Sequence, residues 1–283
     1  MPTFDTPGPL TASVDLPIGE LRVVATDRTD TTVEVHSSTG DRAEAEAVRV
    51  ELVGDELRVQ GRRLGLRTLL VPTPGRSLEV EIALPTGSSL TARSGYGGVQ
   101  VEGRVAGCRV ETGYGDVRLE DAGPVDLTTN YGAVRVTGTV DGDATVVADH
   151  GEVRLGRITG DADLRTKHGT VRVEEVGGTA RLTGVHNDLE LETATADVVA
   201  RSAYGRIRLG RVVRGEVTLT STHGRLEVGV DPASAVWLDV DTRGRVRNAL
   251  EPRPGPEGFA ESVTVTARSQ DGDVVVRRSI TTS

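Results

Sequence analysis

Tyrosine and histidine recur at one position of a short internal repeat, and their side chains are well suited to binding or to acid–base chemistry. Each is followed by glycine, or in one repeat by asparagine, and the repeats follow one another at an almost constant spacing. All four tyrosines and four of the five histidines of the chain lie at this anchor position. The eight anchor residues are Tyr96, Tyr114, Tyr131, His150, His168, His186, Tyr204 and His223. Stacked repeats of this length would align their side chains along one edge.

Several functions of the anchor residues remain open. Stacked rings could simply tighten a turn, which is worth about 0.5 to 1.5 kcal/mol per pair. They could form a linear strip that binds an extended protein, peptide or glycan. In an enzyme, histidine or tyrosine along the same edge could act as acid or base on a bound extended substrate or small molecule. Neighbouring imidazoles could also share a metal ion, although three histidines without a fixed carboxylate are a weaker signal than a zinc motif. We expect no metal site and no cofactor.

Other kinds of chemistry find little support. The sequence contains neither a G-x-x-x-x-G-K-[ST] loop nor a G-x-G-x-x-G turn between a strand and a helix, the motifs that bind nucleotides. A calcium-binding β-roll would repeat aspartate two positions after the anchor, but five of the eight repeats have no acidic side chain there. Carboxylates of a carbohydrate-active enzyme could come from a group that lies at predicted turns, where aspartate is common. This group is Asp141, Asp143, Asp161 and Asp163.

The composition argues against nucleic acid as a partner. The chain has 283 residues and a net charge of −9, and aromatic residues make up only 2% of it. A nucleic-acid-binding protein normally has a basic face with aromatic rings on which bases stack. With so few aromatic residues, the core must consist of valine, leucine, isoleucine and alanine, which suits thin layers of strands.

The residues that follow each anchor alternate between apolar and polar, which is typical of a strand with one buried face. The third and fifth positions after the anchor are apolar in all eight repeats, from Val99 and Val101 to Leu226 and Val228. The position between them holds arginine, glutamate or glutamine. A second alternating segment precedes each anchor. The single cysteine, Cys108, shares an inward position of that segment with valine and alanine, which predicts a buried thiol.

Together these patterns predict an all-β fold, a parallel β-solenoid (β-helix) with about 18 residues per coil. Each coil would contain two or three short strands that pair with the coils above and below it. The glycine after the anchor predicts a corner with positive φ, and Asn187, which replaces it in one repeat, is the residue that best substitutes for glycine there. The only candidate helix is the segment 42–48.

Three regions can be distinguished along the chain. Residues 1–86 predict irregular β coils and a cap, and they include an apolar loop, 61–77, that could either plug the first coil or contact a partner. Residues 87–250 predict the regular repeats. Residues 251–283 predict a loop and two capping strands, 262–267 and 273–278, joined as a hairpin at Asp271-Gly272.

The sequence also predicts a cytoplasmic protein. Its first residues have no basic segment followed by an apolar one, and no apolar run approaches the roughly 20 residues that a membrane-spanning helix needs. A single cysteine cannot form an intrachain disulfide, which fits a reducing compartment. We therefore expect no membrane insertion.

Several motifs resemble those of a known family, the bacterial putative-adhesin family of β-strand-repeat domains of unknown function. The resemblance covers nearly the whole chain, and its order of motifs is the main signal. It rests on the segments 16–23, 80–87, 112–119 and 271–278. The family implies a parallel β-solenoid and supplies no catalytic residues. Typical members have a small residue before the corner glycine, whereas this chain has tyrosine or histidine in all eight repeats.

The function that these observations favour is that of a non-enzymatic, intracellular binding or scaffold protein. It would present the tyrosines and histidines along one edge to an unknown protein, peptide or glycan. The alternative is an enzyme that uses the same edge. A third class is a structural protein whose copies associate end to end. Such association would require an uncapped terminal coil. Self-association is thus one of the partner interactions that we consider.

Overall fold

The computed structural model describes residues 2–38, 40, 42–61, 77–251 and 258–279. The described chain consists mainly of strands, with one short helix, α1 (Arg42–Glu46), and the all-β prediction is confirmed. It divides into two compact units, Met1–Gly138 and Thr139–Ser283. Residues 62–76 of the apolar loop are outside the described residues. Whether this loop plugs the first coil or contacts a partner therefore stays a prediction.

The first unit contains N-terminal strands that lie outside the regular repeats and strands that belong to the repeats. Helix α1 lies within the segment that the sequence indicated. The strands are β1 (Thr3–Asp5), β2 (Thr11–Thr26), β3 (Asp30–Ser37), β4 (Arg49–Val53), β5 (Glu56–Gln60), β6 (Leu78–Pro85), β7 (Ser89–Tyr96), β8 (Val99–Val105), β9 (Gly107–Tyr114), β10 (Val117–Ala122) and β11 (Val125–Tyr131), followed by β12 (Val134–Val140), which runs past the boundary.

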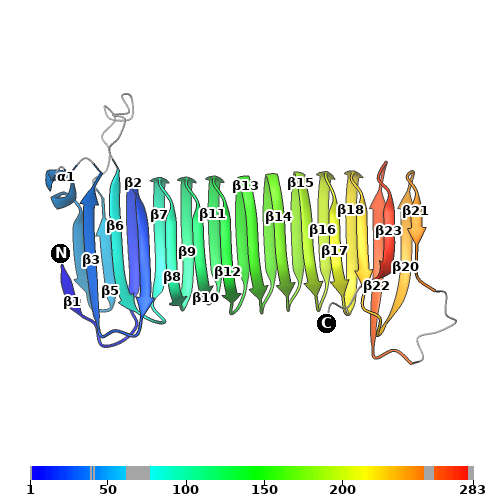
Figure 1. Ribbon diagram of the computed structural model, residues 1–283, viewed down its shortest axis with the longest axis horizontal. Helices are drawn as coiled ribbons and strands as arrows, with labels where there is room; N and C mark the ends of the chain where they lie inside the picture. The colour runs from blue at the N-terminus through cyan, green and yellow to red at the C-terminus, as the bar shows by residue number, and fades with distance from the viewer. Residues whose placement is uncertain (1, 39, 41, 62–76, 252–257, 280–283) are drawn as a thin grey trace. The chain divides into compact units, whose positions relative to one another are not determined.

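Within the first unit, the N-terminal segments differ from the repeats in their pairing. Strands β1 and β3, β3 and β6, and β4 and β5 pair antiparallel, whereas β7 to β11 pair in parallel (Figure 1). Strand β2 belongs to the repeats, because it pairs in parallel with β7 and β8 and places Ile18 beside Tyr96. This register could not be recognised from the sequence, because β3 to β6 lie between β2 and β7 along the chain.

The second unit contains three strands of 15 residues each. Strands β13, β14 and β15 each run through an anchor residue without interruption, and neighbouring strands pair in parallel with Ala144 beside Ala162 and Ala162 beside Ala180. The strands are β13 (Ala144–Ile158), β14 (Ala162–Val176), β15 (Ala180–Ala194), β16 (Val198–Tyr204), β17 (Ile207–Val212), β18 (Gly215–His223), β19 (Leu226–Val230), β20 (Ser234–Thr242), β21 (Val246–Asn248), β22 (Glu261–Ser269) and β23 (Val274–Arg278).

The predicted C-terminal hairpin is wrong. Strands β22 and β23 pair with β18 and β19 on one side and with β20 and β21 on the other, always in parallel (Figure 1). The last repeat is thus inserted between two repeats that precede it in sequence. Asp271-Gly272 does not join a hairpin because it occupies the anchor position, with Gly272 packed on the carbonyl of Gly224.

The core lies where the alternation predicts it. All sixteen apolar side chains at the third and fifth positions after the anchors are at most 2% exposed. Burying each valine, leucine or isoleucine contributes about 1.5 to 3 kcal/mol relative to leaving it exposed. Cys108 is also buried, at 3% exposure, as predicted. The fold is therefore held from inside by aliphatic side chains.

The glycine after the anchor is explained only in part by positive φ. Five of the eight residues at this position have φ between +114° and +155°, namely Gly97, Gly132, Gly151, Gly169 and Gly205. Gly115, Gly224 and Asn187 do not, so positive φ is confirmed for most of these positions and is absent at these three. At Gly115 and Gly224 a Cβ would lie 2.2 and 1.9 Å from the carbonyl oxygen of the preceding repeat. Close backbone stacking therefore excludes a side chain at these positions whatever their φ.

Candidate functional site

Three tyrosine rings stack in the first unit. The ring centroids of Tyr96 and Tyr114 are 4.9 Å apart, and those of Tyr114 and Tyr131 are 5.0 Å apart, with planes within 3° of parallel. The parallel register of β7, β9 and β11 brings these residues together, because it pairs each anchor with the next. About half of each side chain is exposed, between 47% and 55%.

Five rings stack in the second unit, and we call them the ring column. They are His150, His168, His186, Tyr204 and His223. Centroids of adjacent rings are 4.7 to 5.2 Å apart, and the planes are within 9° of parallel except between the last two rings, which are tilted by 22°. Four of the five side chains are exposed, and His150 is half-buried.

Strand spacing sets the distance between the rings. Paired strands lie about 4.7 to 4.9 Å apart, so equivalent side chains on successive repeats recur at nearly that distance. Because the rings are almost parallel, nitrogen atoms of neighbouring imidazoles point in similar directions and do not converge on a common point. A zinc ion needs nitrogen ligands at about 2.0 to 2.1 Å, arranged around it. Within the described ranges no group of three or more histidine, cysteine, aspartate or glutamate residues could hold a metal ion.

The outer edge of the ring column carries polar atoms that the fold does not use. No hydrogen bond to the ring nitrogens of His168 and His186 or to the hydroxyl of Tyr204 is found among the residues that the structure describes. Beside the column, Lys167 Nζ donates a hydrogen bond of 2.7 Å to Asp149 Oδ2. The edge can therefore donate and accept hydrogen bonds at intervals of about 5 Å.

Buried hydroxyl groups near the anchors form hydrogen bonds between successive repeats. Two positions before the anchor, six of the eight repeats have serine or threonine. Several of these hydroxyls donate to the carbonyl oxygen that follows the anchor of the preceding repeat: Thr112 to Gly97 at 3.2 Å, Thr129 to Gly115 at 3.3 Å and Ser202 to Asn187 at 3.4 Å. These hydroxyl residues were not predicted from the sequence, although they recur regularly two positions before the anchor.

Asn187 has a different role from that predicted. Its side chain is buried, at 4% exposure, and its amide nitrogen donates to the backbone oxygen of Thr166 at 3.3 Å and also contacts Thr166 Oγ1. Space for this side chain comes from Gly184, where a Cβ would lie 1.8 Å from Asn187 Oδ1. Asn187 thus fills the space that a serine or threonine side chain fills in other repeats.

Asp271 lies at one end of the ring column. Its Oδ2 is 3.1 Å from Nδ1 of His223, and both side chains are about half exposed. Asp271 was not predicted to be an anchor residue, because an Asp-Gly pair is also a common hairpin turn. The signal was present, since Ser269 lies two positions before it and Val274 and Val276 lie three and five positions after it, as in the other repeats.

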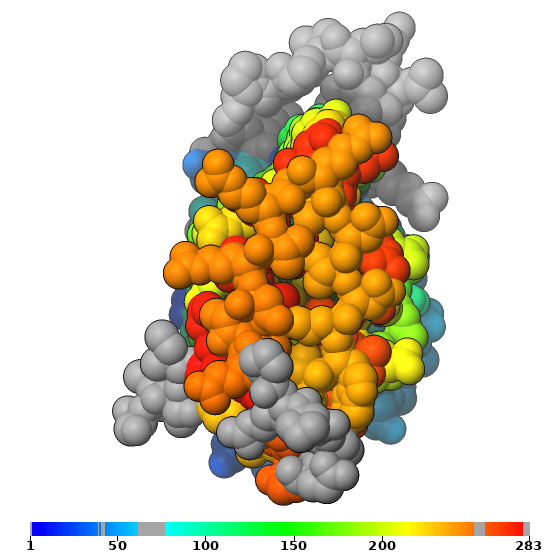
Figure 2. Space-filling view, turned by 90° about the vertical axis from the view of Figure 1, so that its right-hand side faces the viewer, coloured from blue at the N-terminus to red at the C-terminus, as the bar shows by residue number. Residues whose placement is uncertain are grey.

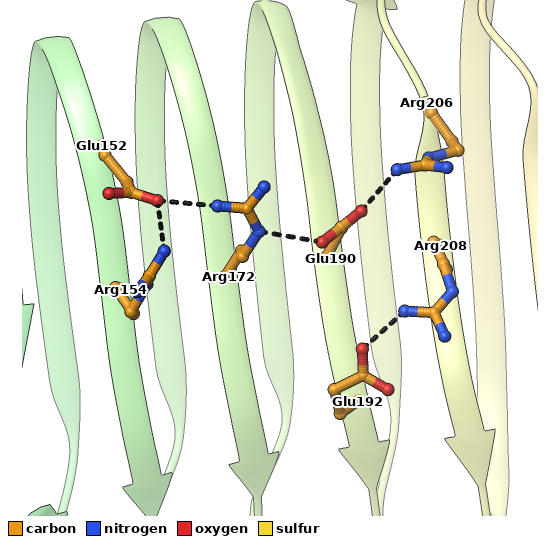
Figure 3. A network of polar contacts seen from close by, with 7 residues as sticks. All are labelled: Glu152, Arg154, Arg172, Glu190, Glu192, Arg206 and Arg208. Carbon is orange, nitrogen blue, oxygen red and sulfur yellow. Dashed lines mark hydrogen bonds and ion pairs between the residues drawn. The ribbon is translucent and has the colours of Figure 1, made fainter. Parts of the chain in front are cut away.

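A network of charged side chains covers the strand segments after the anchors (Figure 3). Glu152 accepts hydrogen bonds from Arg154 at 2.8 Å and from Arg172 at 2.7 Å. Glu190, only 13% exposed, lies 3.1 Å from Nε of Arg172 and 2.5 Å from Nη2 of Arg206. The network links successive repeats, and its carboxylates are already paired with arginines.

Two of the four aspartates considered for glycan hydrolysis accept hydrogen bonds from the backbone, and the other two contact side chains, Asp141 the hydroxyl of Thr159 at 3.4 Å. Asp143 Oδ1 accepts from the amide of Asp161 at 2.9 Å, and Asp161 Oδ1 accepts from the amide of Thr179 at 2.7 Å. Asp163 pairs with Arg165 at 2.7 Å. These contacts explain the recurrence of aspartate at the turns between repeats.

The fold and the stacked anchors define a class of protein, a repetitive all-β chain with rings along its corner positions. The chain belongs to the Toastrack DUF4097 family, whose model matches residues 13–234. This confirms the resemblance to a putative-adhesin-like family of unknown function. No curated protein matches the chain. The single described helix, α1, is too short to cross a membrane.

Several solved structures are similar over most of their length. A putative adhesin from Bacteroides fragilis is 12% identical, with 98% of this chain and 95% of that chain covered and a TM-score of 0.38. A putative adhesin from Parabacteroides merdae is 9% identical, with 98% and 94% covered and a TM-score of 0.43. One from Parabacteroides distasonis is 14% identical, with 98% and 95% covered and a TM-score of 0.37. At these values the likeness carries no functional argument.

Proposed function

We propose that this chain is a parallel β-solenoid of about 18 residues per coil that acts inside the cell as a non-enzymatic binding or scaffold protein. Its ligand is an extended protein, peptide or glycan that lies along the exposed rings. The parallel pairing of β13, β14 and β15, which sets His150 beside His168 and His168 beside His186, supports the solenoid. Fractionation of the source cells tests the intracellular location, which recovery of the protein from the envelope or the medium would contradict.

The exposure of the anchor tyrosines is the observation that carries the binding function. All four tyrosines of the chain are 46% to 55% exposed, whereas the aliphatic side chains three and five positions after each of them are buried. Rings needed mainly for stability would be placed where they bury the most apolar surface. Tyrosine offers a large contact area at low entropic cost and is enriched at binding hot spots.

The ring column of the second unit offers the sharpest test. A triple variant, His150→Ser, His168→Ser and His186→Ser, removes three adjacent imidazoles and keeps small polar side chains in their place. Binding of the natural protein and the variant is measured on a glycan array and on a library of unstructured peptides. We expect the natural protein to bind a restricted set of these probes and the triple variant to lose that set.

A matched control changes the same three strands away from the ring column. Arg157→Ser, Glu175→Ser and Thr193→Ser lie at equivalent positions of β13, β14 and β15. This control should keep the binding of the natural protein. If neither the natural protein nor the control binds any glycan or peptide probe more strongly than the triple variant does, the proposal is wrong.

The alternative enzyme is favoured by one contact, the 3.1 Å pair between His223 and Asp271. A carboxylate beside Nδ1 fixes the orientation of an imidazole, as general acid–base catalysis requires. An enzyme that used this pair would turn over a bound probe and lose turnover, but not binding, on replacement of Asp271 by asparagine. A probe that is bound and recovered unchanged supports the non-enzymatic function.

A further inference from the structure

Strands β20 and β21 form an open edge of the second unit. Among the residues that the structure describes, the backbone of β20 pairs only with β22 and that of β21 only with β23. Figure 2 looks onto this end, with β20 and β21, in orange, toward the viewer. An unpaired strand edge exposes a row of amide and carbonyl groups that can pair with another chain.

Apolar side chains at this edge are uncovered. Val246 is 52% exposed, whereas Val274, its neighbour in register on β23, is 0% exposed. Val240 is half-buried, whereas its neighbour Ala267 on β22 is 0% exposed. Trp237, the only tryptophan of the chain, is 50% exposed on β20. Val240 and Val246 point as core residues do, but within the described ranges no further strand pairs beyond β20 and β21 to cover them.

The exposed charges of this edge are ordered by sign. Asp239 and Asp241 lie on β20 before the corner, and Arg245 and Arg247 lie after it. Arg243 is at the corner, in the anchor position of this repeat, as the stacking of Gly244 on the carbonyl of Gly272 indicates. The two acidic and the two basic side chains are thus equally distant, by two and four positions, from Arg243.

We propose that this edge pairs with the same edge of a second copy of the chain, antiparallel and centred on Arg243. A two-fold axis through the corner would place β20 of each copy beside β21 of the other. Residues equally distant from Arg243 would then face each other. Asp241 would lie opposite Arg245 of the second copy, Asp239 opposite Arg247, and Val240 opposite Val246. Outward residues meet outward residues, and core-facing residues meet core-facing residues.

Charge complementarity selects a second copy as the occupant. The edge carries acidic residues before Arg243 and basic residues after it. When two copies pair antiparallel, each acidic side chain therefore faces a basic one of the other copy, and the two-fold axis makes every such pair occur twice. Only Arg243 would face a like charge, Arg243 of the second copy. It lies at an exposed corner, where water and salt screen the repulsion. Backbone hydrogen bonds between the two edges would add to these contacts.

Charge reversal at Asp241 and Arg245 tests the pairing. Asp239 is not used, because it already binds Arg268 of its own chain at 2.9 Å. The mass of the full chain is measured by sedimentation equilibrium over about a hundredfold range of concentration, where a reversible dimer shows a concentration-dependent mass. We expect the natural protein to dimerise. Asp241→Arg alone or Arg245→Asp alone should weaken the dimer at least about tenfold, because each places like charges opposite each other.

Mixing the two single variants should restore association, because every reversed charge then meets an opposite one. The double variant, Asp241→Arg with Arg245→Asp, should dimerise on its own for the same reason. Circular dichroism shows whether each variant is folded, and the emission of Trp237 should shift to shorter wavelength as the dimer forms. A monomer at every concentration, polymers larger than a dimer, or single variants that dimerise like the natural protein would overturn the proposal. The ring column is unchanged in all these variants, so their outcome is independent of the proposed ligand binding.

Discussion

The carbonyl oxygen of Gly151 lies 2.0 Å from the point where a side chain at Gly169 would place its Cβ. Gly169 also has a φ of +132°. Gly169→Ala should therefore lower the free energy of unfolding by at least about 3 kcal/mol, because strain adds to a backbone clash that separates two repeats. Gly54→Ala is the control, since φ there is +60° and nothing lies within 4 Å of its Cβ, so only about 1 to 2 kcal/mol should be lost. Urea unfolding measures both, and equal losses would show that close stacking does not matter.

Asn187 and Gly184 should behave as a coupled pair. Gly184→Ala alone puts its Cβ against the Asn187 side chain, and should cost about 1 to 3 kcal/mol in unfolding free energy. Asn187→Gly alone removes a buried side chain and its hydrogen bonds to Thr166, and should also destabilise. The double variant restores the residue pattern of the His150 repeat and should be more stable than the sum of the two losses predicts. A double-mutant cycle measures the coupling, and strictly additive losses would contradict this account of Asn187.

Cys108 should make stability depend on alkaline pH. Burial raises the pKa of its thiol to about 12, whereas an unfolded thiol titrates at about 8.5. As the pH rises, the thiol therefore loses its proton first in the unfolded state. The contribution of Cys108 to the free energy of unfolding is constant below about pH 8.5, and above it falls by about 1.4 kcal/mol per pH unit, up to the pKa of the folded thiol. Unfolding at several pH values, compared with Cys108→Ala, isolates the effect from other groups. A thiol reagent that modifies the folded protein as fast as the unfolded one would contradict this burial.

Glu190 should contribute more to stability than an ordinary surface carboxylate. It is 13% exposed between Arg172 and Arg206, so Glu190→Gln weakens two charge-assisted hydrogen bonds and should cost about 1 to 2 kcal/mol. Glu111→Gln breaks an exposed pair with Arg93, 3.1 Å apart, and should cost less than about 1 kcal/mol. Thermal unfolding at low and high salt compares the two. A larger loss for Glu111 would show that the network of Figure 3 does not link the repeats.

Local alternation was enough to predict the regular repeats. The buried positions of Val153 and Leu155 follow from period-2 patterning, and the stacking of His150 on His168 follows from their separation by one repeat. Both depend on contacts between neighbouring repeats of similar sequence.

Pairing between distant segments could not be predicted in the same way. Ile18 lies beside Tyr96, and Ser221 lies beside Ser269, although other strands intervene in the sequence. Asn187 shows a second limit, because the sequence indicates a glycine substitute but not the direction of its side chain. That direction depends on Gly184, whose missing side chain leaves the necessary space.

According to the proposed function, the ring column binds a ligand and is not needed for the fold. The most direct measurement is the dissociation constant of the triple variant, His150→Ser, His168→Ser and His186→Ser, for the glycan or peptide that the natural protein selects. Binding should weaken at least about tenfold, equal to about 1.4 kcal/mol, while circular dichroism remains that of the folded chain. A folded variant with unchanged affinity would contradict the claim, and so would a variant that fails to fold, because the rings would then be structural.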